Sequence, residues 1–246
     1  MKVLISPVSL EEATSIIEAG ADIIDIKNVN EGSLGAQFPW NISEIVALIH
    51  RNRITASATL GDLPYKPGTA ALAAYGAAHC RVNYIKAGLH GLNTYSQAVE
   101  MMVGIRRAVR MVSDDIKVVA SGYADYRRFN GLNTWDLVRA AKDASCDGVM
   151  VDTAIKDGKT LFDALTLDEI NDFVGMAKEA NLLVALAGSI KAEHVEVLLK
   201  NQPDIIGLRG AVCEGPDRHS KISVEKTKSF INLVRDSTGK AKEVRK

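Results

Sequence analysis

The chain has 246 residues, 47% of them hydrophobic, and its 30 Lys and Arg residues balance 30 Asp and Glu residues. This balance excludes a strongly basic nucleic-acid-binding surface, and no apolar run approaches the roughly 18 residues of a membrane span. The N-terminal segment MKVLISPVSLEEA lacks the apolar stretch of a signal peptide, so we expect a cytoplasmic protein with a small-molecule partner, no nucleic acid and no membrane.

Short runs rich in Val, Ile and Ala alternate with longer amphipathic segments along the chain. This alternation is typical of repeated β-strand and α-helix units that form a parallel sheet. Strands are expected at residues 3–6, 23–27, 54–60, 82–87, 116–121, 148–152, 183–187 and 205–209. Helices are expected at residues 10–19, 42–51, 69–78, 95–112, 134–144, 167–180, 192–200 and 224–235.

Eight such units without a Pro/Gly-rich linker favour closure into one (β/α)8 TIM barrel, which typically needs about 250 residues. We assign residues 1–237 to a single barrel domain and residues 238–246 to a charged C-terminal tail that is frayed from Gly239. Helix N-caps are expected at Ser9, Asn41, Thr94, Asn133, Thr166 and Ser223.

Cysteine and histidine usage gives no sign of a metal. Cys80, Cys146 and Cys213 are far apart and are expected to be reduced core residues, as in a reducing compartment. The sequence has no paired-histidine metal motif and no glycine-rich dinucleotide motif after a strand. We therefore expect chemistry without a metal or a cofactor.

Three lysines lie at or just beyond the ends of predicted strands, namely Lys27, Lys86 and Lys156. The carboxyl ends of barrel strands form the active-site rim, so these lysines are expected to converge with Asp25 and Asp152. Burial and neighbouring cations lower the pKa of a lysine, and an unprotonated amine attacks a carbonyl to form a Schiff base. The five residues are candidate catalytic residues. An Asp25–Lys27 ion pair, a solvated Lys86 and a capping role for Asp152 are the structural alternatives.

Barrels often bind phosphate on the loops that follow strands seven and eight. Gly188 and Ser189 follow the seventh predicted strand, while Arg209, Gly210 and Ala211 end and follow the eighth. We interpret these five residues as phosphate-binding candidates. For Arg209 a rim ion pair is the alternative.

Several longer segments are specific enough to indicate a family: MKVLISPVSLEEA, ADIIDIKNVNEGSLGAQFPW, NYIKAGLHG, DGVMVDTAIKDGKTLFD, LAGSI and GLRGAVC. Over residues 1–237 the chain resembles the (5-formylfuran-3-yl)methyl phosphate synthases of methanofuran biosynthesis. That family is similar in plan to class I aldolases, which are barrels that use lysine imine chemistry and no metal.

The resemblance implies that Lys27 forms the Schiff base and Lys86 donates or accepts a proton, with Asp25, Asp152 and Lys156 completing the site. It implies a lyase that joins two glyceraldehyde 3-phosphate molecules into 4-(hydroxymethyl)-2-furancarboxaldehyde phosphate, with loss of phosphate and two waters. By analogy with aldolases, an enamine on Lys27 is expected to attack the aldehyde of the second triose. We also expect a homo-oligomer.

Two other functions fit the same residues. One is an ordinary class I aldolase or a triose-phosphate isomerase-like barrel, which would stop earlier in the reaction. The other is a non-catalytic barrel that binds a phosphorylated metabolite.

Overall fold

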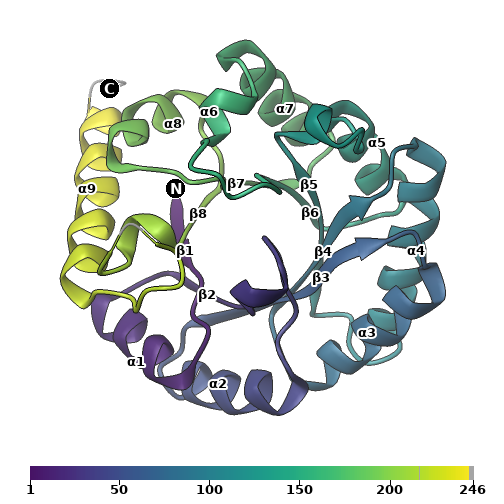
Figure 1. Cartoon of the computed structure of the whole chain (residues 1–246), viewed down its shortest axis with the longest axis horizontal. Helices are drawn as coiled ribbons and strands as arrows, with labels where there is room; N and C mark the ends of the chain where they lie inside the picture. Colours follow the sequence, from purple (N-terminus) through teal and green to yellow (C-terminus); the bar gives the residue numbers. More distant parts are fainter. Residues whose placement is uncertain (216, 244–246) are drawn as a thin grey trace.

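The computed structural model describes residues 1–215 and 217–243, and its eight parallel strands close into a barrel in sequence order (Figure 1). This confirms the predicted (β/α)8 fold. The strands are β1 (Lys2–Ile5), β2 (Ile23–Ile26), β3 (Thr55–Pro64), β4 (Tyr84–Gly91), β5 (Lys117–Tyr123), β6 (Gly148–Asp152), β7 (Leu183–Leu186) and β8 (Ile205–Leu208).

Helices form an outer ring around the barrel, as Figure 1 shows. They are α1 (Leu10–Ala19), α2 (Pro39–Arg51), α3 (Pro67–His79), α4 (Tyr95–Arg110), α5 (Thr134–Asp143), α6 (Leu161–Ala164), α7 (Leu167–Glu179), α8 (Val195–Asn201) and α9 (Val224–Glu243). Short 3-10 turns are η1 (Val29–Glu31), η2 (Tyr126–Arg128), η3 (Ala192–His194) and η4 (Gly210–Val212). None of the helices in the described ranges is both long and apolar enough to cross a bilayer.

Most helix starts follow the expected caps. The side chains of Ser9, Thr94, Asn133, Thr166 and Ser223 each accept a hydrogen bond from a backbone N–H of the following turn. The Asn41 prediction is wrong, because α2 begins at Pro39, whose fixed φ and missing N–H suit the first helical position.

The last helix is longer than expected. Because α9 continues to Glu243, it runs into the segment that we predicted to be frayed from Gly239. Residues 244–246 of the predicted tail lie outside the described residues.

Alternation along the strands separates two cores. On β2, Ile24 and Ile26 pack outward in the large core between strands and helices, while Asp25 and Lys27 point into the barrel, as predicted. The lower barrel interior is filled by a second apolar cluster that includes Leu4, Val119 and Met150. The charged side chains Asp25 and Lys27 lie above this cluster, toward the carboxyl ends of the strands, where they line a cavity.

Candidate active site

A cavity of about 530 Å³ opens at the carboxyl ends of the barrel strands. Its lining contains nine of the ten site residues expected from the sequence: Asp25, Lys27, Asp152, Lys156, Gly188, Ser189, Arg209, Gly210 and Ala211. The tenth, Lys86, lies beneath them beside a small apolar void of about 20 Å³. The structure therefore brings all the predicted residues to one end of the barrel.

Lys86 is fixed by a buried ion pair with Asp25. Its Nζ lies 2.6 Å from Asp25 Oδ2, and both side chains are almost fully buried. The same oxygen accepts a hydrogen bond from Ser6 Oγ at 3.2 Å. Asp25 is thus paired across the barrel interior with Lys86 on β4, so the alternative of an Asp25–Lys27 ion pair is wrong. The alternative of a solvated Lys86 is also wrong, because its side chain is buried.

Lys156 forms the second ion pair, with Asp152. Its Nζ lies 2.7 Å from Asp152 Oδ1 and 3.0 Å from Thr153 Oγ1. Burial raises the pKa of the Asp152 carboxyl, but the ammonium groups of Lys156 and Lys27 outweigh burial, and the pKa falls from 3.8 to about 2. Asp152 is therefore an anion at every physiological pH.

Lys27 differs from both of these lysines. Its Nζ donates to the backbone carbonyl of Ser33 at 3.2 Å, and no carboxylate of the described residues lies within ion-pair distance of it. Burial lowers the pKa of the Lys27 ammonium from 10.5 to about 7, although Asp152 and Asp25 act in the opposite direction. A large fraction of this buried amine is unprotonated near neutral pH.

The segment 28–35, here called the cap, lies across the mouth of the barrel; it follows β2 and is dark purple near the centre of Figure 1. Asp62 holds it by accepting hydrogen bonds from the backbone N–H groups of Ser33 at 2.8 Å and Leu34 at 3.2 Å. The hydroxyl of Tyr123 donates to the same carboxylate. A side chain at Gly32 would collide with Asp62, so glycine is required where the cap passes it.

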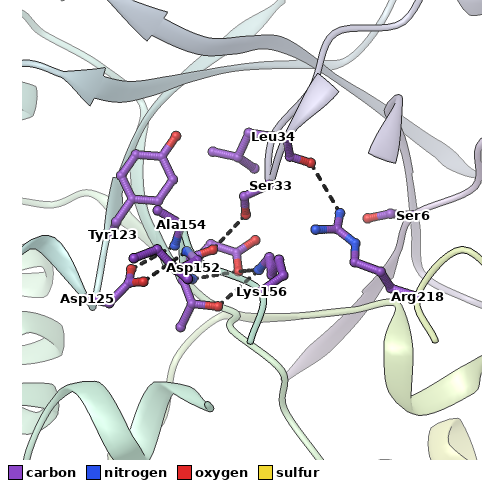
Figure 2. A network of polar contacts seen from close by, with 12 residues as sticks. Ser6, Ser33, Leu34, Tyr123, Asp125, Asp152, Ala154, Lys156 and Arg218 are labelled. Atoms are coloured by element: carbon purple, nitrogen blue, oxygen red, sulfur yellow. Dashed lines mark hydrogen bonds and ion pairs between the residues drawn. The ribbon is translucent and has the colours of Figure 1, made fainter. Parts of the chain in front are cut away.

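The cap also contacts the residue that follows β6. Ser33 Oγ donates to the carbonyl of Thr153 at 2.8 Å, next to Asp152 (Figure 2). Asp125 orders the loop that follows by accepting from the N–H groups of Ala154 at 2.7 Å and Ile155 at 2.9 Å. These contacts fix Lys156 and the cap relative to each other.

The expected anion-binding loops follow β7 and β8, and Gly188 in the first of them lies beside Thr153. Gly188 and Ser189 both have positive φ, 110° and 48°, in the turn after β7, and Gly210 begins η4 after β8. Arg209 is not free to bind a ligand, because its guanidinium is held by Glu12 at 2.8 Å and by the Ser6 carbonyl at 2.7 Å. The rim ion pair is therefore the observed arrangement for the Arg209 side chain.

Sequence reasoning missed two groups. The cap contacts of Ser33, Asp62 and Tyr123 join loops and strand ends without any shared motif. Arg218 also lines the cavity, and its guanidinium donates to the carbonyl of Gly32 in the cap at 3.3 Å. In the sequence, Arg218 is marked only by being a basic residue in the long connection after the eighth strand.

Residues 3–231 match the family model described as 4-HFC-P synthase. The chain belongs to the 4-HFC-P synthase family. Two relatives, both named (5-formylfuran-3-yl)methyl phosphate synthase, cover nearly the whole chain. The Archaeoglobus fulgidus protein is 54% identical over 234 residues, 95% of this chain and 99% of its own. The Methanocaldococcus jannaschii protein is 48% identical over 236 residues, 96% of this chain and 100% of its own. The resemblance inferred from the sequence is confirmed, and this member of the 4-HFC-P synthase family is an enzyme.

Solved structures similar to this 4-HFC-P synthase family member are other barrels. The 3-hexulose-6-phosphate synthase of Salmonella typhimurium has a TM-score of 0.64 at 14% identity, covering 96% of this chain and 100% of its own. KGPDC from Streptococcus mutans has a TM-score of 0.65 at 12% identity, covering 96% of this chain and 97% of its own. At these identities the similarity establishes the fold alone.

Proposed function

We propose that this enzyme is a lyase of methanofuran biosynthesis that makes (5-formylfuran-3-yl)methyl phosphate from two molecules of glyceraldehyde 3-phosphate. The observation that carries the proposal is Lys27, a buried amine with a pKa of about 7 in the wall of a cavity. Such an amine is a competent Schiff-base nucleophile at neutral pH. The atoms balance, since two trioses minus one phosphoric acid and two waters give the furan product.

The carbon skeleton of the product decides which role the imine plays. In (5-formylfuran-3-yl)methyl phosphate, the ring carbon that bears the phosphorylated methylene has three carbon neighbours. Only one bond can be cut to leave two three-carbon chains, and it joins this central carbon to the terminal carbon of the other triose. An enamine attack on an aldehyde would give an unbranched chain, so the aldolase-like step expected above does not lead to this product.

We therefore assign Lys27 an electrophilic imine. One triose phosphate is isomerised to dihydroxyacetone phosphate, and the Lys27 amine attacks its C2 ketone with loss of water. The positive iminium makes C2 an acceptor for a carbon nucleophile. Lys86, held by Asp25, and Lys156, held by Asp152, are the groups that we assign to donating and returning protons around C2.

The second triose supplies the nucleophile. Removal of the C2 proton of glyceraldehyde 3-phosphate and departure of its phosphate from C3 leave an enol with a nucleophilic terminal carbon. Attack on the iminium forms the new bond, the C1 hydroxyl of the first triose adds to the new ketone, and a second water leaves. Loss of a ring proton then expels the Lys27 amine and completes the aromatic ring.

The buried setting favours this sequence. The cap covers Lys27, and its Ser33 carbonyl orients the amine by accepting one hydrogen bond. Exclusion of water protects an imine and an enol from hydrolysis and from side reactions. The fixed cations next to Lys27 are positioned before substrate binds, so little reorganisation is needed during the reaction.

Borohydride trapping tests the function. Reduction in the presence of glyceraldehyde 3-phosphate, followed by peptide mass mapping, should place a triose adduct on Lys27. Unreduced enzyme should release phosphate and form a furan chromophore. Lys27→Arg should fold but form neither the adduct nor the furan. The control Lys142→Arg, on the exposed face of α5, should form both.

Each rival has its own outcome. Formation of dihydroxyacetone phosphate alone would support an isomerase. A sugar bisphosphate without phosphate release would support an ordinary aldolase. Phosphate-ligand binding without any adduct would support a non-catalytic barrel, and a fully active Lys27→Arg would remove the nucleophile assignment.

A further inference from the structure

Arg218 is the one guanidinium of the cavity lining that is available to a ligand in the described part of the chain. The other arginine there, Arg209, is bound bidentately by Glu12. The Arg218 side chain is partly buried, and Figure 2 shows it entering the cavity from the β8 side, whereas Lys156 enters from β6. The two cations thus approach the cavity from different walls.

The Arg218 backbone is held in place by Arg209. The Nε of Arg209 donates to the carbonyl of Arg218 at 2.6 Å, while Glu12 and the Ser6 carbonyl hold the rest of the Arg209 guanidinium. Arg209 therefore positions Arg218. This contact explains how an arginine in a long connection can be presented at a defined place in the cavity.

The charge of Arg218 is not neutralised locally. Its guanidinium contacts a neutral acceptor, the Gly32 carbonyl, and no carboxylate among the described residues lies within ion-pair distance. Its neighbour Asp217 is exposed and instead accepts the N–H of His219 at 2.9 Å. Burial lowers the pKa of the guanidinium, although Asp152 opposes the shift, but an arginine does not deprotonate at physiological pH. A partly buried guanidinium without a counterion favours binding of an anion.

The proposed reaction requires a second anion site. Both trioses carry a phosphoryl group of nearly two negative charges, and one group is retained while the other leaves. The backbone of Gly188, Ser189, Gly210 and Ala211 offers one site on the β7 and β8 loops. A leaving phosphate gains negative charge on its departing oxygen. The parallel N–H donors of an arginine guanidinium are suited to stabilise that charge.

We propose that Arg218 binds the phosphoryl group of the second triose and stabilises it as it leaves, an assignment that rests on the proposed function. In this step a base takes the C2 proton of glyceraldehyde 3-phosphate. The C–H electron pair becomes the C2–C3 double bond, the C3–O bond breaks, and its electron pair departs with phosphate. Arg218 contacts the phosphate and takes no proton.

Two variants and a matched control test the proposal. Arg218→Gln removes the charge but keeps an amide donor for the cap carbonyl. Arg218→Lys keeps the charge but lacks the paired N–H donors of a planar guanidinium. Arg139→Gln, at an exposed arginine on α5, is the control. Thermal unfolding of all three checks that the fold is retained.

In the first assay dihydroxyacetone phosphate alone is trapped on Lys27 with borohydride, and in the second phosphate release from glyceraldehyde 3-phosphate is followed. Arg218→Gln should form the adduct within about twofold of the unmodified enzyme, because that step uses the first site. Its kcat for phosphate release should fall by about 100-fold, the effect of losing one charge-stabilising donor. Arg218→Lys should recover part of this loss, and Arg139→Gln should change neither assay.

A third assay needs no catalysis. In calorimetric titration with inorganic phosphate, the unmodified enzyme should bind two equivalents and Arg218→Gln one. The second site would be overturned if Arg218→Gln bound as many equivalents of phosphate as the unmodified enzyme. It would also be overturned if Arg218→Gln released phosphate at the original rate, or if it lost adduct formation and phosphate release in parallel. Failure of the unmodified enzyme to form any adduct or furan would refute the proposed function instead, and the titration would still decide whether Arg218 binds phosphate.

Discussion

Replacing Lys27 by methionine should stabilise the fold, and the gain should depend on pH. The folded state binds the Lys27 proton with a pKa of about 7 because burial opposes the ammonium, whereas the unfolded chain holds it with the ordinary pKa of 10.5. The unfolded state therefore binds more protons between these values, so the stability of the unmodified enzyme rises with pH across this window. Methionine has nearly the same length and no charge to desolvate.

The magnitude follows from the two pKa values. They differ by 10.5 − 7, or about 3.5 pH units, and each unit corresponds to about 1.4 kcal/mol. Below pH 7 the buried ammonium thus costs about 5 kcal/mol of unfolding free energy, and at pH 9 about 2 kcal/mol remains. Lys27→Met should exceed the parent in stability by about 3 kcal/mol more at pH 6 than at pH 9.

Urea unfolding of both proteins at pH 6, 7.5 and 9 measures the difference, because all other titrating groups largely cancel at each pH. The exposed Lys142→Met serves as control and should shift stability by less than about 0.5 kcal/mol at every pH. A stability difference between Lys27→Met and the parent that stays constant from pH 6 to pH 9 would refute a lowered pKa at Lys27.

Three further predictions address the site. The rate of borohydride trapping at Lys27 should rise with pH and level off above about pH 7, since only the neutral amine attacks; a rise that continues to pH 10 would indicate an ordinary lysine. Asp62→Asn should loosen the cap, which amide hydrogen exchange at Ser33 and Leu34 would report as faster exchange, with unchanged exchange in α5. Glu12→Gln leaves the buried Arg209 guanidinium without its carboxylate and should destabilise the enzyme by about 3 kcal/mol in urea; a loss below 1 kcal/mol would show that backbone carbonyls suffice.

The sequence predicts the parts of the fold that depend on local periodicity. Alternation within DIIDIK places Asp25 and Lys27 on the inner face of β2, and the eight strands occur where apolar runs were found. Boundaries were less predictable. β4 continues through Gly91, beyond the predicted strand end at residue 87, because Gly88 pairs with β3 and β5 and Gly91 pairs with β3. A strand extension of this kind depends on its neighbours and leaves little trace in its own composition.

Charge pairing could not be read from the sequence, because each carboxylate has several lysines or arginines within reach once the barrel closes. Asp25 contacts Lys86 from a strand two positions away around the barrel, and Glu12 contacts Arg209 across 197 residues of sequence. The Asn/Gly/Ser-rich segment 28–35 is typical of a loop. Its position over the site is fixed by Asp62 and Tyr123, which carry no local signal for it. The expected homo-oligomer stays a prediction.

The different partners of the three lysines explain why one of them is suited to be the nucleophile. Asp25 neutralises Lys86 and Asp152 neutralises Lys156, so both cations are fixed at short distance. Burial is the main cause of the low pKa of Lys27, and because each carboxylate is paired with another lysine, its opposing effect is not enough to restore the ordinary value. If either carboxylate instead contacted Lys27 directly, it would hold that amine as an ammonium and oppose attack on a carbonyl. The ion pairs thus have two effects at once. They retain charged groups for proton transfer inside the barrel, and they leave Lys27 with only the Ser33 carbonyl as its hydrogen-bond acceptor among the described contacts.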